Sequence, residues 1–159
     1  EDLNDPEAWG PKYDYYMELS PAWTSDDGKL STYRLYTYIY GGGAHGMMYE
    51  NYITFDTASG RILGIKDIFG ETGYRKAIDV LGHRLSSWLS EERGSEMEMA
   101  PDLGETDYFD DFSSLHYEWV DGLIYPRPAI TKQGVVFSYQ PYENGSFADG
   151  IRHFIIPNP

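Results

Sequence analysis

The sequence contains no cysteine among its 159 residues. This absence excludes disulfide bonds, thiolate metal sites and a cysteine nucleophile. Long apolar runs are missing too: no stretch approaches the roughly 20 residues that a membrane-spanning helix needs, and no signal peptide is visible. The chain begins at Glu1 without a methionine, so we expect that a targeting segment and membrane anchor precede it in the full-length protein.

Basic residues are scarce. Twelve Lys and Arg stand against 26 Asp and Glu, which leaves a formal net charge of −14 at pH 7. Such a surface repels nucleic acid and anionic lipid, and this excludes binding to either through a basic patch. The same charge attracts cationic partners over a long range. The alternative is that the acidity only maintains solubility.

The pattern of apolar residues predicts an α+β fold. Alternation predicts a strand over residues 12–19, and β-rich stretches between turn signals predict strands over 30–40, 47–55, 123–130, 135–140 and 151–156, with a connection over 20–29. Between Tyr74 and Leu89 the apolar residues recur at steps of three and four, which predicts one long amphipathic helix over about residues 73–93. A helix lying on a mainly antiparallel sheet gives two layers.

The chain is predicted to divide near residues 69–73. Residues 1–70 form a strand-rich N-terminal subdomain, and residues 71–159 form a second subdomain with the helix and three strands. The strongly acidic stretch 91–111 is predicted to be a solvated loop. Its carboxylates do not follow the EF-hand spacing, so it does not predict a calcium site.

A glycine-rich segment, Gly-Gly-Gly-Ala-His-Gly, occupies residues 41–46 between two predicted strands. A phosphate-binding loop needs a helix after its glycines and a lysine nearby, whereas a strand follows here, so we predict a hairpin connection. His45 is the candidate general base of a hydrolase, but no nucleophile signature accompanies it. The four histidines lack metal-ligand spacing. We therefore predict no catalytic residue, no metal site and no cofactor.

Tyrosine is the distinctive residue, with 15 in the chain. Tyr36, Tyr38 and Tyr40 share one face of a predicted strand, and Tyr52 lies on the partner strand. Such a ladder stabilises a sheet through cross-strand aromatic pairs. It also offers a contact surface, since tyrosine combines apolar area with a hydroxyl group. We expect most of these tyrosines to be structural, with Tyr38 and Tyr40 at a binding surface.

Several short motifs follow one another in a set order: YIYGGGAHG, then ITFDTASGRILGIKDIF, then GVVFSYQPYENGSFADGIRHFIIP. In this order they resemble the family of C-terminal ectodomains of the lysozyme-sensing anti-sigma factor RsiV. Related domains of unknown function accompany PdaC-type peptidoglycan deacetylases and occur in envelope lipoproteins. The matching positions include Gly42, Gly43, Ala44, His45, Phe55, Asp56, Gly60, Asp67, Phe69, Pro141, Tyr142, Glu143, Ala148, Gly150, Ile156 and Pro157. Gly41 and the stretch ENGSF depart from the family pattern.

The resemblance implies a non-catalytic, extracytoplasmic domain that is membrane-anchored in the full-length protein. Its expected role is binding or sensing, with a cationic protein such as a lysozyme as the partner. The contact region is predicted at Pro141, Tyr142 and Glu143 with Tyr38 and Tyr40. Gly42, Gly43, Ala44, His45, Asp67 and Gly150 are predicted to be structural. The alternatives are a glycan- or peptidoglycan-binding module that uses exposed Tyr and Trp, and a hydrolase centred on His45.

Overall fold

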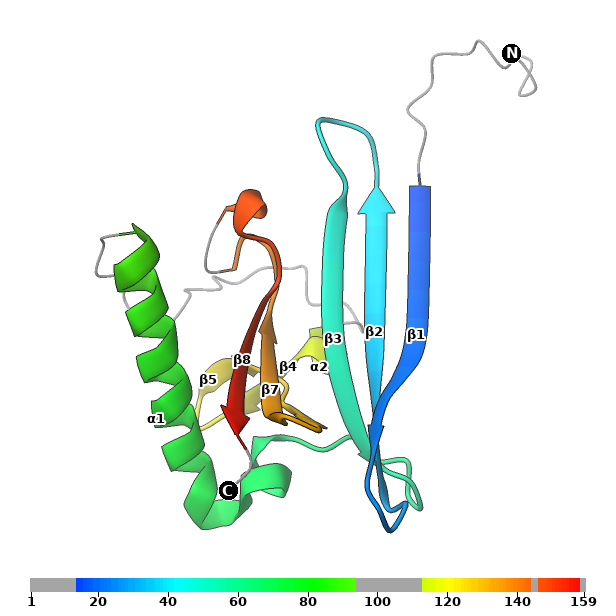
Figure 1. Ribbon diagram of the computed structural model, residues 1–159, viewed down its shortest axis with the longest axis vertical. Helices are drawn as coiled ribbons and strands as arrows, with labels where there is room; N and C mark the ends of the chain where they lie inside the picture. Colours follow the sequence, from blue (N-terminus) through cyan, green and yellow to red (C-terminus); the bar gives the residue numbers. More distant parts are fainter. Residues whose placement is uncertain (1–13, 94–112, 144–145, 158–159) are drawn as a thin grey trace, which may run out of the picture.

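The computed structural model describes residues 14–93, 113–143 and 146–157 (Figure 1). These residues contain three antiparallel sheets, one long helix and two short helical segments. The elements, in chain order, are β1 (Asp14–Thr24), β2 (Leu30–Tyr40), β3 (Met47–Asp56), α1 (Ile65–Arg93), α2 (Ser113–His116), β4 (Tyr117–Val120), β5 (Leu123–Pro126), β6 (Ala129–Thr131), β7 (Gly134–Tyr139), η1 (Phe147–Asp149) and β8 (Arg152–Pro157). The predicted α+β class, with a helix packed on antiparallel sheets, is confirmed.

Strand β7 is the centre of the molecule. It pairs with β6 on one side and β8 on the other, and all six of its residues are buried. Figure 1 shows the β7–β8 layer between α1 and the β1–β2–β3 sheet. Val135, Phe137 and Tyr139 pack in the hydrophobic core with Leu81 and Leu85 of α1. Because side chains alternate along a strand, the residues between them face the β1–β2–β3 sheet.

Threonine side chains attach the β1–β2–β3 sheet to strand β6. Thr32 and Thr54 are both 0% exposed. The Thr32 hydroxyl donates to the carbonyl oxygen of Ile130 at 2.6 Å, and the Ile130 N–H donates to the Thr54 hydroxyl at 2.8 Å. The two hydroxyls lie 2.7 Å apart, so Thr54 donates to Thr32 and each buried polar group has a partner.

The observed elements correct several predicted boundaries. The predicted connection 20–29 is strand as far as Thr24, with a register shift between Pro21 and Trp23. The predicted strand 123–130 is two strands, β5 and β6, and the sequence pattern missed β4. Helix α1 starts at Ile65, earlier than predicted, and has a break at Gly70, where φ is +71°. Glycine tolerates that left-handed backbone without a steric penalty.

The first two residues of the predicted strand 12–19 and most of the acidic stretch 91–111 lie outside the described residues. Within the described residues, no helix combines the length and the apolar character needed to cross a membrane.

Candidate functional site

The β2–β3 hairpin ends in the glycine-rich segment. Gly42 and Gly43 have φ values of +92° and +102°, which glycine adopts readily. The Tyr40 hydroxyl donates to the Gly43 carbonyl oxygen at 2.9 Å and so braces the tip. At Gly46, a Cβ atom would lie 2.4 Å from the Tyr38 ring, so the absence of a side chain lets that ring lie against the hairpin. The predicted hairpin therefore forms, and its tyrosines hold its shape.

His45 connects this hairpin to a segment about a hundred residues later in the chain. Its ring stacks on Phe147 with centroids 3.8 Å apart and planes 18° from parallel. Its Nε2 lies 3.3 Å from the Tyr142 hydroxyl, and its Nδ1 lies 3.0 Å from the Gly46 carbonyl oxygen. Both ring nitrogens thus have partners within the protein. This geometry makes His45 a connecting residue between the hairpin and the later loop.

Tyr142 is exposed, with 56% of its surface accessible, and so is the His45 ring beside it. Its φ is +72°, an uncommon value for a bulky residue. Such strained positions persist only where the surroundings over-determine them, and they concentrate at binding and catalytic sites. The surroundings here are buried Pro141 before it and the Glu143 carboxyl after it. The Tyr142 ring is therefore held in one place while it remains open to a partner.

Glu143 follows the exposed tyrosine in the chain and bonds back to the start of the turn. Its Oε2 accepts a hydrogen bond from the backbone N–H of Gln140. Burial outweighs this bond and raises the pKa of the Glu143 carboxyl to about 8. Burial and the nearby Glu143 charge also raise the pKa of the Tyr49 hydroxyl. The turn 140–143 is consequently sensitive to pH near neutrality.

Residues 41–46, 141–143 and 146–149 together form what we call the hairpin–loop surface. It contains most of the predicted site residues: Gly42, Gly43, Ala44, His45, Pro141, Tyr142 and Glu143, with Tyr38 and Tyr40 at the end of β2. Gly150 ends η1 beside it with φ of +67°. Asp67 lies elsewhere, where it accepts a hydrogen bond from the Gly64 N–H at the start of α1 and pairs with Arg61.

Gln140 joins the turn to the edge of β3. Its side-chain Oε1 accepts from the Glu50 N–H at 2.9 Å, and its Nε2 donates to the Glu50 carbonyl oxygen at 2.9 Å. The amide thereby acts as one further residue of a neighbouring strand. Gln140 is only 5% exposed. Since the same residue also starts the turn that carries Tyr142, this contact fixes the hairpin–loop surface to the sheet.

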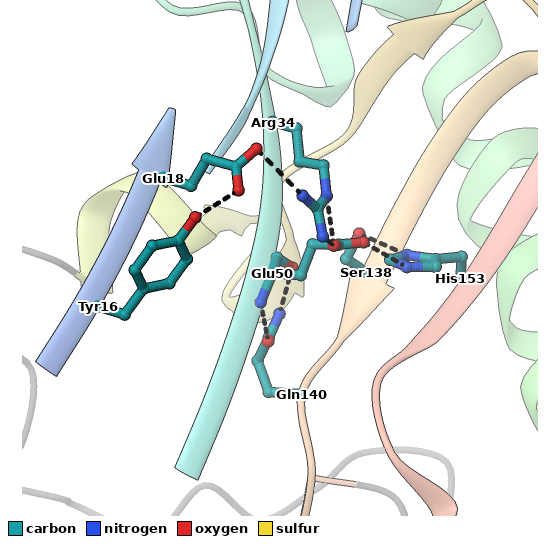
Figure 2. A network of polar contacts seen from close by, with 7 residues as sticks. All are labelled: Tyr16, Glu18, Arg34, Glu50, Ser138, Gln140 and His153. Carbon is teal, nitrogen blue, oxygen red and sulfur yellow. Dashed lines mark hydrogen bonds and ion pairs between the residues drawn. The ribbon is translucent and has the colours of Figure 1, made fainter. Parts of the chain in front are cut away.

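A chain of polar side chains runs across the junction between β2–β3 and β7–β8 (Figure 2). Arg34 pairs closely with Glu50 through its Nε and Nη2 atoms. The other Glu50 oxygen lies 2.9 Å from Nε2 of His153. Hydrogen bonds and charges from His153 and Arg34 hold the pKa of the Glu50 carboxyl below its usual value. The pairing is partly buried, so it orders the junction more firmly than a surface ion pair would.

Ser138, His153 and Glu50 have the residue types of a catalytic triad but not its arrangement. The Ser138 hydroxyl lies 2.9 Å from Nδ1 of His153, and the carboxylate bonds to Nε2. In a serine hydrolase the hydroxyl bonds to Nε2 and the carboxylate to Nδ1. Ser138 is also only 5% exposed. Ser138 therefore has neither the hydrogen-bond arrangement nor the accessibility of a serine nucleophile.

A groove of about 480 Å³ opens beside this network, between β1 and the β6–β7 turn. Arg34, Tyr52 and His153 line one part of it, and Pro21, Val136 and Ile155 another. Within the described residues, no group of three or more His, Cys, Asp or Glu side chains is placed to hold a metal ion.

The sequence pattern missed Gln140, Arg34 and the pairing of Glu50 with His153. The sequence does contain a feature that indicates the Arg34–Glu50 pair, because each charged residue shares a strand face with aromatic residues. Arg34 shares a face of β2 with the tyrosine ladder, and Glu50 shares a face of β3 with Tyr52. Two inward charges of opposite sign on paired strands indicate a buried ion pair. Their bonds to β7 and β8 were beyond the pattern because they depend on how the two sheets pack.

The scan against protein-family models matched none, and the search of curated proteins found no match. Solved structures share the fold. A DUF3298 family protein from Pseudomonas aeruginosa PAO1 has 22% identity and a TM-score of 0.53, over 93% of this chain and 60% of that chain. A DUF3298 member from Bacteroides fragilis NCTC 9343 has 21% identity and a TM-score of 0.57, over 92% of this chain and 51% of that chain. The chain thus spans less than two thirds of either structure.

At this identity the likeness shows the fold, that of DUF3298 proteins, a domain of unknown function. The finer resemblance to the RsiV and PdaC types stays a prediction.

Proposed function

We propose that this chain is a non-catalytic, extracytoplasmic binding domain for a cationic protein, with a lysozyme-like hydrolase as the first candidate. Its contact region is the hairpin–loop surface. The observation that carries the proposal is Tyr142: an exposed aromatic ring held on a strained backbone, braced by His45 and Phe147, in a chain of net charge −14.

Rigid aromatic side chains are favoured anchors in protein interfaces. Tyrosine is enriched among the few residues that carry most of the binding free energy. A ring that is already fixed loses little conformational entropy on binding, which improves affinity. The acidic charge of the chain adds long-range attraction that speeds the encounter with a basic protein. These two features together support protein binding at this surface.

The polar groups of the site support a non-catalytic role. Both nitrogens of His45 lie against groups of the protein itself, so the ring is occupied as a connector and is poorly placed to act as a general base. Ser138 is buried and bonds to Nδ1 of His153 instead of Nε2, so this pair does not offer a serine nucleophile to a substrate.

A glycan-binding module is the second candidate, and exposed aromatic rings favour it. Trp119 on the β4–β5 hairpin is 70% exposed and Tyr142 is 56% exposed. Flat rings of this kind stack on sugar faces. Titration with a soluble peptidoglycan fragment distinguishes the two candidates, because sugar binding is weakly affected by salt whereas binding of a basic protein is strongly affected.

The test is calorimetric titration of lysozyme into the wild-type chain and into Tyr142→Ala, with Trp119→Ala as the matched control for an exposed aromatic residue. We expect wild type and Trp119→Ala to bind alike, and Tyr142→Ala to bind about 30-fold more weakly, the effect of removing an interface anchor. Binding should weaken steadily as the salt concentration rises from about 0.05 to about 0.5 M, because the Debye length falls over this range from above about 10 Å to below about 8 Å.

No binding at low ionic strength would remove lysozyme as the partner. Equal affinity of wild type and Tyr142→Ala would overturn the assignment of the surface.

A further inference from the structure

Strand β1 carries more exposed large hydrophobic side chains than any other described strand. Tyr15, Tyr16, Met17 and Leu19 are 59%, 50%, 52% and 63% exposed, and all belong to its first half. Within the described residues β1 pairs only with β2, so its other edge has no strand beside it. Ile39, the β2 partner of Tyr15, adds a further exposed apolar side chain at 42%. Tyr15, Met17 and Leu19 alternate with Tyr16 along the strand, and with Ile39 they form an apolar stripe at a sheet edge that no described strand covers.

The two faces of this half-strand differ in chemistry. Tyr15 and Met17 share one face, where the Tyr15 hydroxyl lies 3.5 Å from the Met17 sulfur. Tyr16 and Glu18 share the other, where the tyrosine hydroxyl donates to the carboxylate at 2.7 Å. By alternation Leu19 lies on the apolar face and Asp14 on the acidic face. One face is therefore apolar and the other carries only negative charge.

The charge on the acidic face is largely uncompensated. Glu18 lies 4.0 Å from Nη1 of Arg34, but Arg34 is already paired with Glu50 through its Nε and Nη2 atoms. The Glu18 side chain is 44% exposed. Strand β1 contains no Lys or Arg at all. A positive side chain placed beside Glu18 and Asp14 would meet carboxylates without a competing cation on the strand.

Natural proteins usually protect such an edge with lysines, prolines or bulges, because an open edge recruits other strands. The second half of β1 has this protection: it contains Pro21 and the register shift that follows it. The first half, Asp14–Leu19, has none. Its six residues offer about 20 Å of edge for pairing.

We propose that the first half of β1 is a docking site for an extended peptide strand in which basic and apolar side chains alternate. The strand adds to the free edge as a fourth strand of the sheet. Its apolar side chains cover Tyr15, Met17 and Leu19, and its basic side chains pair with Asp14 and Glu18. Backbone hydrogen bonds give affinity in this mode, and the alternating side chains give specificity.

Charge distinguishes this occupant from a second copy of the chain. Two copies would each bring a net charge of −14 and a β1 strand that has carboxylates and no cation. Their approach is repulsive, whereas a basic strand is attracted. The proposal concerns β1 alone, so it does not depend on the hairpin–loop surface.

The test uses the full 159-residue chain and an end-blocked synthetic peptide of alternating lysine and valine. A second peptide of identical sequence carries N-methyl groups on every residue, which removes the backbone donors of both edges. The protein variants are Met17→Lys, which places a cation on the apolar face, and Leu123→Lys as control. Leu123 is 51% exposed on the β5 strand, close to the 52% of Met17.

We expect the unmodified peptide to bind wild type and Leu123→Lys equally and Met17→Lys at least 10-fold more weakly. Amide hydrogen exchange followed by NMR should slow at least 10-fold within residues 14–19. Tyr142→Ala should bind the peptide like wild type, which separates failure of this proposal from failure of the proposed function.

Equal binding of the N-methylated peptide would overturn strand addition in favour of simple charge attraction. Absence of binding, or protection outside residues 14–19, would overturn the site. A wild-type dimer in sedimentation velocity that Met17→Lys dissociates would assign the edge to a second copy instead.

Discussion

Gln140→Ala is the most informative single change in this structure. The side chain supplies both partners of the Glu50 backbone, at 2.9 Å each, and also donates to the Asn51 side-chain oxygen at 3.2 Å. Alanine leaves the Glu50 N–H and C=O without these partners in a place where the residue is 8% exposed. An unsatisfied buried polar group costs about 1–3 kcal/mol.

Two such groups on an edge strand, where some water can enter, give an expected loss of about 3 kcal/mol in the free energy of unfolding. With a urea m-value of about 2 kcal/mol/M, the unfolding midpoint should fall by about 1.5 M. The assay is urea unfolding followed by circular dichroism. Gln133→Ala, at an exposed glutamine in the β6–β7 turn, is the control and should change stability by less than about 0.5 kcal/mol.

A loss of less than about 1 kcal/mol in the free energy of unfolding would refute the reasoning, because it would mean that the Gln140 hydrogen bonds to the Glu50 backbone contribute little to stability. Should Gln140→Ala fail to fold, Gln140→Glu keeps the acceptor for the Glu50 N–H and replaces only the donor. It should then be destabilised at pH 8 and recover on acidification, since a protonated carboxyl can donate again.

Four further predictions concern pH and local geometry. Burial raises the pKa of Glu143 to about 8, so its contribution to stability is complete below about pH 4.5 and is lost as the pH rises through 8; Glu143→Gln should flatten the change in urea midpoint between pH 5 and 9. The pKa of Glu50 is lowered, so its contribution is present above about pH 4.5 and is lost on acidification; Glu50→Gln should destabilise the chain at pH 7 and remove the fall in its midpoint below pH 4.5. Gly134→Ala should lower the free energy of unfolding by more than about 2 kcal/mol, seen as a lower melting temperature, because the new Cβ would lie 2.2 Å from the Ile156 carbonyl oxygen on a backbone with φ of +142°. Gly28→Ala is the control: its turn is open, with nothing within 4 Å of the new Cβ, so it should lower stability less. His45→Ala should preserve the fold, cost about 1 kcal/mol through loss of the Phe147 stack, and speed amide exchange in residues 146–149; unchanged exchange there would contradict its role as a connector.

The class of fold could be predicted because it depends on local periodicity. Strand β2 was predicted at its observed bounds, and the helix stripe from Tyr74 to Leu85 packs in the core as its spacing indicated. The break at Gly70 was missed because the short helical turn before it, Ile65–Phe69, is too brief to show a period of its own. β4 was missed for the same reason, since four residues cannot establish alternation.

The candidate site could be predicted only in pieces. The glycine segment indicated a hairpin, and Tyr142 was selected by resemblance, but neither indicated that His45 would stack on Phe147. That contact joins residues about a hundred positions apart and depends on the packing of β3 against β7. The contact made by the Gln140 amide could not be predicted either, because nothing in the sequence around a glutamine at the end of a strand indicates two hydrogen bonds to the backbone of Glu50.

The central claim is that a cationic protein binds at the hairpin–loop surface. The most direct test is a map of backbone amide shifts in the NMR spectrum of the labelled chain during titration with lysozyme at low salt. The account predicts that the largest shifts occur at His45, Tyr142 and Phe147, and that they disappear at high ionic strength. Shifts confined to residues far from this surface, or no shifts at all, would contradict it.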